Sequence, residues 1–192
     1  MGGSAGGFPA LYFSHRFPGS GALVTNAHTD VRDYYKGHVE RFQKFCWPQC
    51  DTIDQVLDHT EIEIRSRYRK KMENTLIYMQ GAADPFHIYN QQVPFLNAIA
   101  GTSSVQKVIP ITDFWGRLGH SHSVVPGAFM PWLKALITAP DLKLPTLFEV
   151  HKVLQGDTMI QPPAARSVQK MAKPSDKDIT KANLLSKLLL QR

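Results

Sequence analysis

The chain has 192 residues, 43% of them hydrophobic and 10% aromatic, a composition that supports a packed core and excludes wholesale disorder. Its formal net charge is +6, but residues 163–192 hold seven basic and two acidic side chains, so the body is nearly neutral, unlike that of a typical RNA-coating protein. Two cysteines exclude the disulfide framework of a small secreted scaffold, and the longest uncharged stretch, residues 85–106, is too polar to cross a bilayer.

Residues 1–29 contain one basic side chain and no acid, and they are rich in glycine and large apolar residues. We interpret this stretch as an extended arm whose apolar side chains insert into neighbouring proteins. Packing of the stretch on the chain's own core is the alternative. The candidate partner-binding residues of the arm are Phe8, Leu11, Tyr12, Phe13 and Phe17.

Two long helices are predicted next, over residues 30–46 and residues 52–80. In both, apolar side chains recur at spacings of three and four residues, which places them on one face of a helix. Pro48 ends the first helix and Gly81 caps the second. Because the connection over residues 47–51 is short, the two helices are expected to form an antiparallel hairpin.

The periodicity weakens after the hairpin. We expect a short helix around residues 93–100, an edge strand over 105–112 and a loop over 116–126. Two more helices, over 127–138 and 145–154, are separated by a proline.

The predicted fold class is mainly α, an antiparallel helical hairpin plus short proline-broken helices. The expected organisation is an extended apolar, glycine-rich arm (1–29), a small helical body (30–156, with the hairpin at about 30–80), a linker (157–174) and an amphipathic cationic helix (175–192).

The predicted C-terminal helix has a wide apolar face opposite lysines, a pattern typical of helices that bind a partner groove or an anionic lipid surface. Docking on its own body is the alternative. Its proposed contact residues are Leu185, Leu188 and Leu189. Trp115 and Arg117 form a further candidate partner contact, because aromatic residues and arginine are enriched at interfaces.

A basic cluster occupies the predicted second helix. Five positive side chains in seven residues favour contact with phosphate groups of RNA or lipid, although a solvated helix face explains them equally well. The residues are Arg65, Arg67, Arg69, Lys70 and Lys71.

The cysteine pair gives weak evidence for chemistry. Cys46 and Cys50 are separated by three residues, which is not the spacing of redox dithiols or zinc knuckles, so we expect buried thiols. A local disulfide, or a metal half-site completed by His38, is the alternative.

Histidines give a second weak signal. His120 and His122 alternate as metal ligands in an extended segment do, with Asp113 nearby, but a solvated or interface loop is favoured over a metal site. We assign no Gly-x-Ser-x-Gly nucleophile elbow to the chain. The Walker loop and the His-Glu-x-x-His motif do not occur in it.

These observations predict a non-catalytic accessory subunit of a large multi-protein assembly, with no cofactor and no metal. A mitochondrial respiratory-chain or ATP-synthase complex is the first choice, on the basis of mild basicity and the acid-free N-terminal stretch. The alternatives are a mitochondrial ribosomal protein that contacts rRNA, and a small metal- or thiol-dependent enzyme. The expected location is mitochondrial, soluble or peripheral, without a transmembrane helix.

Overall fold

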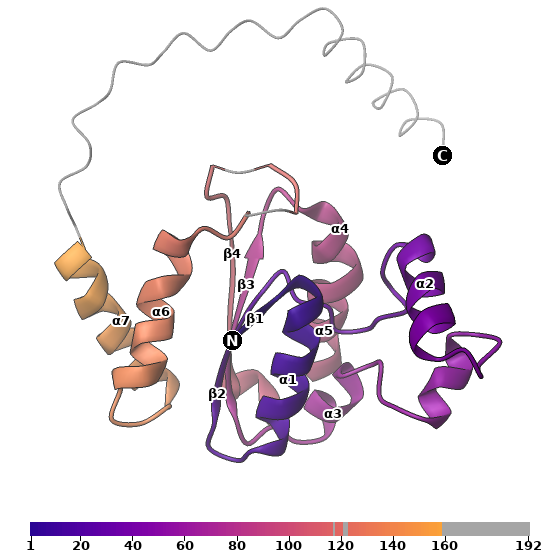
Figure 1. The fold of residues 1–192 in the computed structure, drawn as a ribbon. Helices are drawn as coiled ribbons and strands as arrows, with labels where there is room; N and C mark the ends of the chain where they lie inside the picture. Colours follow the sequence, from indigo (N-terminus) through magenta and orange to yellow (C-terminus); the bar gives the residue numbers. More distant parts are fainter. Residues whose placement is uncertain (117, 121–122, 159–192) are drawn as a thin grey trace, which may run out of the picture. The chain divides into compact units, whose positions relative to one another are not determined.

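A computed structural model describes residues 1–116, 118–120 and 123–158. Residues 1–157 form one compact unit. It is built on a sheet of four parallel strands in the order β1-β2-β3-β4, with helical segments between the strands (Figure 1). The strands are β1 (Gly2–Gly3), β2 (Gly21–Thr25), β3 (Thr75–Gly81) and β4 (Val108–Asp113).

The helices of the described residues are mostly short. The α-helices are α1 (Gly7–Arg16), α2 (Lys36–Cys46), α3 (Arg65–Lys70), α4 (Pro85–His87), α5 (Val93–Ile99), α6 (Pro126–Thr138) and α7 (Leu144–Thr158). Three 3-10 turns, η1 (Ser4–Gly6), η2 (Asp54–Asp58) and η4 (Ser103–Lys107), and one π-helical turn, η3 (Ile88–Gln92), complete the set.

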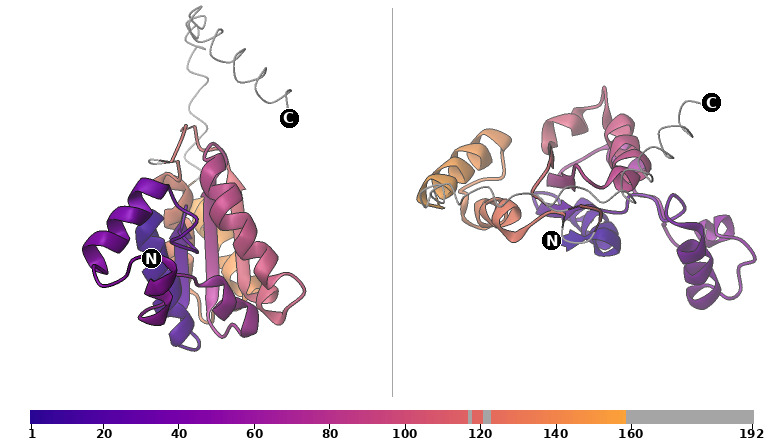
Figure 2. Two further views of the ribbon diagram at one scale, coloured as in Figure 1. Left: turned by 90° about the vertical axis from the view of Figure 1, so that its right-hand side faces the viewer. Right: turned by 90° about the horizontal axis from the view of Figure 1, so that it is seen from above.

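The central strand β3 shows how the sheet is packed. All seven of its residues are buried, and they alternate between two cores because successive side chains of a strand point to opposite faces. Leu76 and Tyr78 pack with α1, α3 and α5, whereas Ile77 and Met79 pack with α6 and α7. The sheet therefore lies between two helical layers (Figure 2).

The prediction of a mainly α fold is wrong, and so is the predicted hairpin. Residues 52–80 form η2, α3 and β3 instead of one helix. A parallel strand covered on both faces reads as a continuous apolar run, and such a run also fits a helical stripe. Gly81, predicted as a helix cap, is the last residue of β3.

The prediction of an extended N-terminal arm is also wrong. Residues 1–29 contain β1, α1 and β2, and Leu11 is fully buried in the core beside the sheet. The segment folds on its own body because the apolar face of α1 needs a surface to cover, and β2 supplies it.

Other local predictions are confirmed. The first predicted helix exists as α2, although it begins six residues later, and the helices predicted near residues 93, 127 and 145 correspond to α5, α6 and α7. The predicted strand exists as β4. No helix among the described residues has the length and apolar character needed to cross a membrane. The linker and the terminal helix, predicted over residues 157–192, fall almost wholly outside the described residues.

Candidate active site

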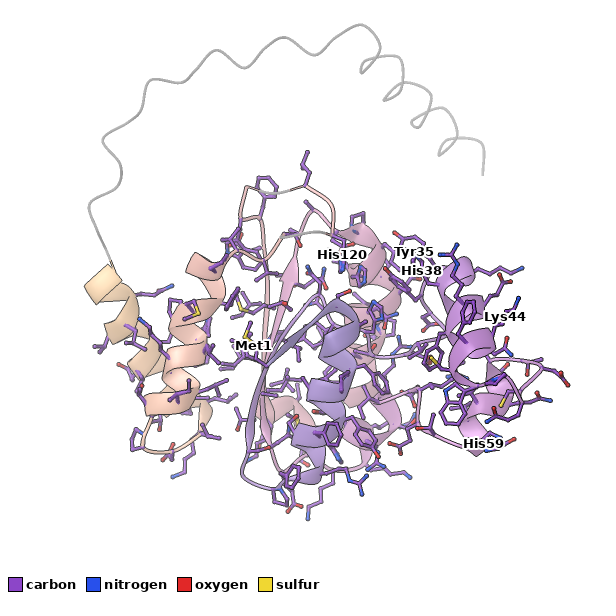
Figure 3. All side chains as sticks on the ribbon, viewed as in Figure 1. Met1, Tyr35, His38, Lys44, His59 and His120 are labelled. Carbon is purple, nitrogen blue, oxygen red and sulfur yellow. The ribbon has the colours of Figure 1, made fainter. Side chains whose placement is uncertain are left out.

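The carboxyl ends of parallel strands meet at one edge of a sheet, which is where ligands bind in open α/β folds. Three polar residues follow three of the strands at this edge: Ser4 after β1, Asp84 after β3 and His120 after β4. Figure 3 shows His120 at the end of the sheet near α4. The topology thus brings together side chains that are up to 116 residues apart in the chain.

A sharp strand-to-helix turn holds Ser4. Its φ angle is +51°, a left-handed conformation that costs free energy for any residue with a Cβ atom. Glycine is required on both sides of this turn. A Cβ atom on Gly2 would lie 2.1 Å from the carbonyl oxygen of Gly6, and one on Gly7 would lie 2.4 Å from the Cβ of Ala27. The backbone is therefore built to hold one side chain at the tip of the turn.

His120 connects this serine to the carboxylate. Its Nε2 atom lies 2.8 Å from Ser4 Oγ, and its Nδ1 atom lies 2.7 Å from Asp84 Oδ2. Because the carboxylate can only accept, Nδ1 carries the ring proton and Nε2 is left as the acceptor for the serine hydroxyl. Ser4 and His120 are only half-buried, so a ligand can reach both.

The electrostatics keep the carboxylate ionised. Burial of Asp84 acts to raise the pKa of its carboxyl group, but the interactions with His120 and His87 outweigh burial and hold that pKa below its ordinary value. The backbone N–H of His87 also donates to Asp84 Oδ1 at 3.3 Å. The site therefore places a buried negative charge beside the imidazole of His120.

His87 lies behind the imidazole of His120. The two rings stack with centroids 4.0 Å apart, and His87 Nδ1 lies 2.9 Å from Asp84 Oδ2 in a contact that is not aligned as a hydrogen bond. Burial lowers the pKa of His87 and so favours its neutral form. His28 also stacks on His87, with ring centroids 5.3 Å apart, and burial lowers the pKa of His28 to about 4.

Asn26, which follows β2, fixes the loop that carries His120. Its Nδ2 atom donates to Ser123 Oγ at 2.7 Å and to the carbonyl oxygen of His120 at 3.3 Å. Its Oδ1 atom accepts from the Gly81 N–H at 2.8 Å. The left-handed φ of +46° suits asparagine, which tolerates this conformation better than most residues. All four strands thus contribute a residue at this edge.

Two cavities lie near the serine: one is lined by its neighbour Ala5 and the other by Ser4 itself. One, of about 500 Å³, is mostly apolar; it is bounded by Ala5, by α1 and by residues of the segment 31–62, which contains α2. The other, of about 280 Å³, is lined by Ser4 itself and His120 together with the polar side chains of Thr25, Asn26 and Ser123.

The same residues could also hold a cation. Ligand atoms of Asp84, His87 and His120 all lie within 4.8 Å of one another, and this donor set suits zinc or another borderline divalent ion. Such an ion would compete with the hydrogen bond between His120 Nδ1 and Asp84. A metal centre at these residues would not account for the second hydrogen-bonding contact of His120, which is to Ser4.

Of the predicted arm contacts, three pack on the chain's own core. Leu11 is fully buried, and Phe8 and Tyr12 pack against the same cluster. Phe13 and Phe17 are 57% and 63% exposed and remain predicted partner contacts.

Three residues of the basic cluster form ion pairs or hydrogen bonds within the protein. Arg65 bonds to Asp33 at 2.7 Å and to Thr29 and Asn90, Arg67 pairs with Glu61, and Lys71 lies 3.1 Å from Glu73. Arg69 and Lys70 are exposed. Contact of this cluster with phosphate stays a prediction.

The other predicted sites are dispersed. Cys46 and Cys50 are both free, but only Cys50 is buried as expected. Trp115 packs against the core on the α6 face, and Asp113 is exposed at the end of β4. The predictions for Arg117, His122, Leu185, Leu188 and Leu189 lie outside the described residues.

The nucleophile-elbow motif around Ser4 was missed in the sequence analysis. Gly2-Gly3-Ser4-Ala5-Gly6 is a Gly-x-Ser-x-Gly sequence between a strand and a helix, so the statement that the chain carries no nucleophile elbow was wrong. It was missed because this stretch was interpreted as an arm. His120 was considered as a metal ligand but interpreted as part of a solvated or interface loop, and Asp84 was not considered.

Comparisons with known proteins give no further information. The chain matches no protein-family model, no curated protein and no solved structure.

Proposed function

We propose that the protein is a serine hydrolase that cleaves carboxylic esters through an acyl-enzyme. The observation that carries this proposal is the continuous hydrogen-bonded chain from Ser4 Oγ through both nitrogens of His120 to the buried carboxylate of Asp84. This is the arrangement that activates a serine for nucleophilic attack. The left-handed serine between strand and helix, and the order serine, aspartate, histidine along the chain, resemble α/β-hydrolases.

The chemistry follows from the roles of the three residues. Ser4 Oγ attacks the carbonyl carbon of the ester while His120 Nε2 takes the hydroxyl proton, and Asp84 stabilises the imidazolium. The Ala5 backbone N–H, next to the nucleophile, is the expected donor to the developing oxyanion. His120 then returns the proton to the leaving alkoxide as the ester C–O bond breaks. Water hydrolyses the acyl-Ser4 ester by the same steps.

This proposal takes the place of the accessory-subunit prediction. Membership of a mitochondrial assembly and contact with rRNA stay predictions, and nothing in the site depends on them.

The test is hydrolysis of a short p-nitrophenyl ester by the full-length protein. Wild type should hydrolyse it, and Ser4→Ala should lose at least about a thousandfold in kcat. Ser103→Ala is the matched control, because Ser103 is exposed in η4 and takes no part in the triad. Equal rates for Ser4→Ala and wild type would overturn the proposal.

A metal centre is the second candidate, because the ligand atoms of Asp84, His87 and His120 converge. The two candidates make opposite predictions for a chelator. A serine hydrolase keeps its activity after dialysis against EDTA, whereas a metal-dependent hydrolase loses activity and regains it when zinc is returned.

A further inference from the structure

The two cavities beside Ser4 differ in chemistry, and the difference indicates which half of a substrate each one takes. The larger cavity is walled mainly by carbon: the segment 31–62 contributes the side chains of one wall, and α1 contributes those of the other. Its principal apolar lining residues are Phe8, Val31, Val39, Phe42, Trp47 and Ile62.

The smaller cavity presents hydrogen-bonding groups. It contains the hydroxyl of Thr25, the amide of Asn26 and the hydroxyl of Ser123, and His120 forms part of its wall. The Asn26 amide and the Ser123 hydroxyl bond to each other and to the backbone of Gly81 and His120, so they form a polar wall. The hydroxyl of Thr25 adds a further group that a polar ligand can meet in this cavity.

The position of the histidine decides which cavity receives the leaving group. The leaving alkoxide must take its proton from His120 Nε2, so it departs on the side where His120 lines the wall, which is the smaller cavity. The acyl group stays bonded to Ser4 Oγ with its carbonyl oxygen toward the Ala5 N–H. The larger cavity begins at Ala5, the residue next to the nucleophile, and we place the remainder of the acyl group there.

We propose, on the basis of the proposed hydrolase function, that the substrate is an ester of an uncharged apolar acid with a small polar alcohol. The acyl chain occupies the cavity between α1 and the segment 31–62, and the alcohol occupies the cavity formed by Thr25, Asn26 and Ser123.

Val39 is the residue best placed to control the length of the acyl chain. It lies on α2, is 8% exposed and lines the acyl cavity. A larger side chain here shortens the cavity, and a smaller one lengthens it. Val153 offers a matched control, because it lies on α7 and is 63% exposed.

The experiment measures kcat/KM of the full-length protein on two series of esters. The first holds the alcohol constant and lengthens the acyl chain from two to eight carbons. The second holds the acyl group constant and compares glycerol-like with apolar alcohols. In wild type, kcat/KM should rise about three- to fourfold for each added acyl methylene until the cavity is full.

The variants identify the cavity. Val39→Trp should remove the rise of kcat/KM with acyl length, whereas Val153→Trp should keep the wild-type rise. Val39→Ala should shift the optimum to longer acyl chains, and it tests the assignment independently of whether the tryptophan variant folds.

The outcomes separate this inference from the proposed function. Wild type that hydrolyses all acyl lengths equally, through Ser4, would overturn the acyl-cavity assignment and leave the hydrolase intact. A change in the alcohol series on substitution of Val39 would show that the two cavities have the reverse roles. No hydrolysis of any ester would overturn both proposals.

Discussion

The side-chain amide of Asn26 donates a 2.7 Å hydrogen bond to Ser123 Oγ, and so connects the end of β2 to the loop that carries His120. The same amide donates to the His120 carbonyl, and its oxygen accepts from the last residue of β3. Asn26 therefore positions the general base, His120, through hydrogen bonds to its loop and not through a bond to the nucleophile Ser4.

Replacing Asn26 should reduce kcat about 10- to 100-fold, because a loosely held imidazole is misplaced for proton transfer. Asn26→Gly is the suitable variant, since glycine accepts the left-handed backbone of this position. Asn74→Ala is the control: Asn74 is also fully buried and hydrogen-bonded, to Ser14 and Tyr68, but lies away from the site. If Asn26→Gly and Asn74→Ala lost kcat equally, the loss would be explained by lower stability and would contradict a positioning role for Asn26.

Replacing the carboxylate should disable the histidine. In Asp84→Asn the amide can donate to Nδ1, which moves the ring proton to Nε2 and removes the acceptor for Ser4; kcat should fall about 10⁴-fold. Circular dichroism and a thermal melt establish that the variant folds. Asp113→Asn is the control, because Asp113 is an exposed aspartate at the end of the neighbouring strand. Activity retained in Asp84→Asn would exclude the triad.

Two adjacent glycines should respond differently to the same change. A Cβ on Gly7 would meet the Cβ and Cα of Ala27 at 2.4 and 2.8 Å, whereas a Cβ on Gly6 has no neighbour within 4 Å. Gly7→Ala should lower the free energy of unfolding by about 1–3 kcal/mol and displace Ser4. Gly6→Ala should change it by less than about 0.5 kcal/mol. Urea denaturation measures both, and similar losses would contradict the packing described for the elbow.

Acid should destabilise the protein through His28. Its pKa is about 4 in the folded state and about 6.5 when unfolded, so between these values the unfolded chain binds more protons. The contribution of His28 to stability is complete above about pH 6.5 and declines as pH falls toward 4.

The variant His28→Phe keeps a ring against Tyr34 and removes this titration. Its melting temperature should fall less between pH 7 and pH 5 than that of wild type. His59→Gln, at an exposed histidine, should follow the wild-type curve. A pH dependence unchanged in His28→Phe would assign the acid sensitivity to other groups.

The sequence predicted local elements better than their assembly. The helices α2, α5, α6 and α7 were recognisable from apolar spacing and proline positions. Strand β3 was not, because a strand buried on both faces lacks the alternation that separates it from a helix. Without that strand there is no parallel sheet, and without the sheet there is no edge at which distant residues meet.

The candidate site shows the same division. The Gly-x-Ser-x-Gly motif around Ser4 is present in the sequence, and it was missed because the stretch was interpreted as an extended arm. Asp84 and His120 carry no local signal of partnership, since 36 residues separate them and only the order of β3 and β4 brings them within 2.7 Å. Asn26 has no recognisable sequence signal either, because its role depends on contacts with two other loops.

Chemical modification of the nucleophile tests the central claim most directly. An alkyl fluorophosphonate reacts with a serine activated by a histidine and leaves ordinary serines unmodified. After treatment of the full-length protein, mass spectrometry of its peptides should find one phosphonyl adduct, on Ser4, which is absent in Ser4→Ala and forms far more slowly in Asp84→Asn. An unmodified Ser4, or an adduct elsewhere that persists in Ser4→Ala, would contradict the account.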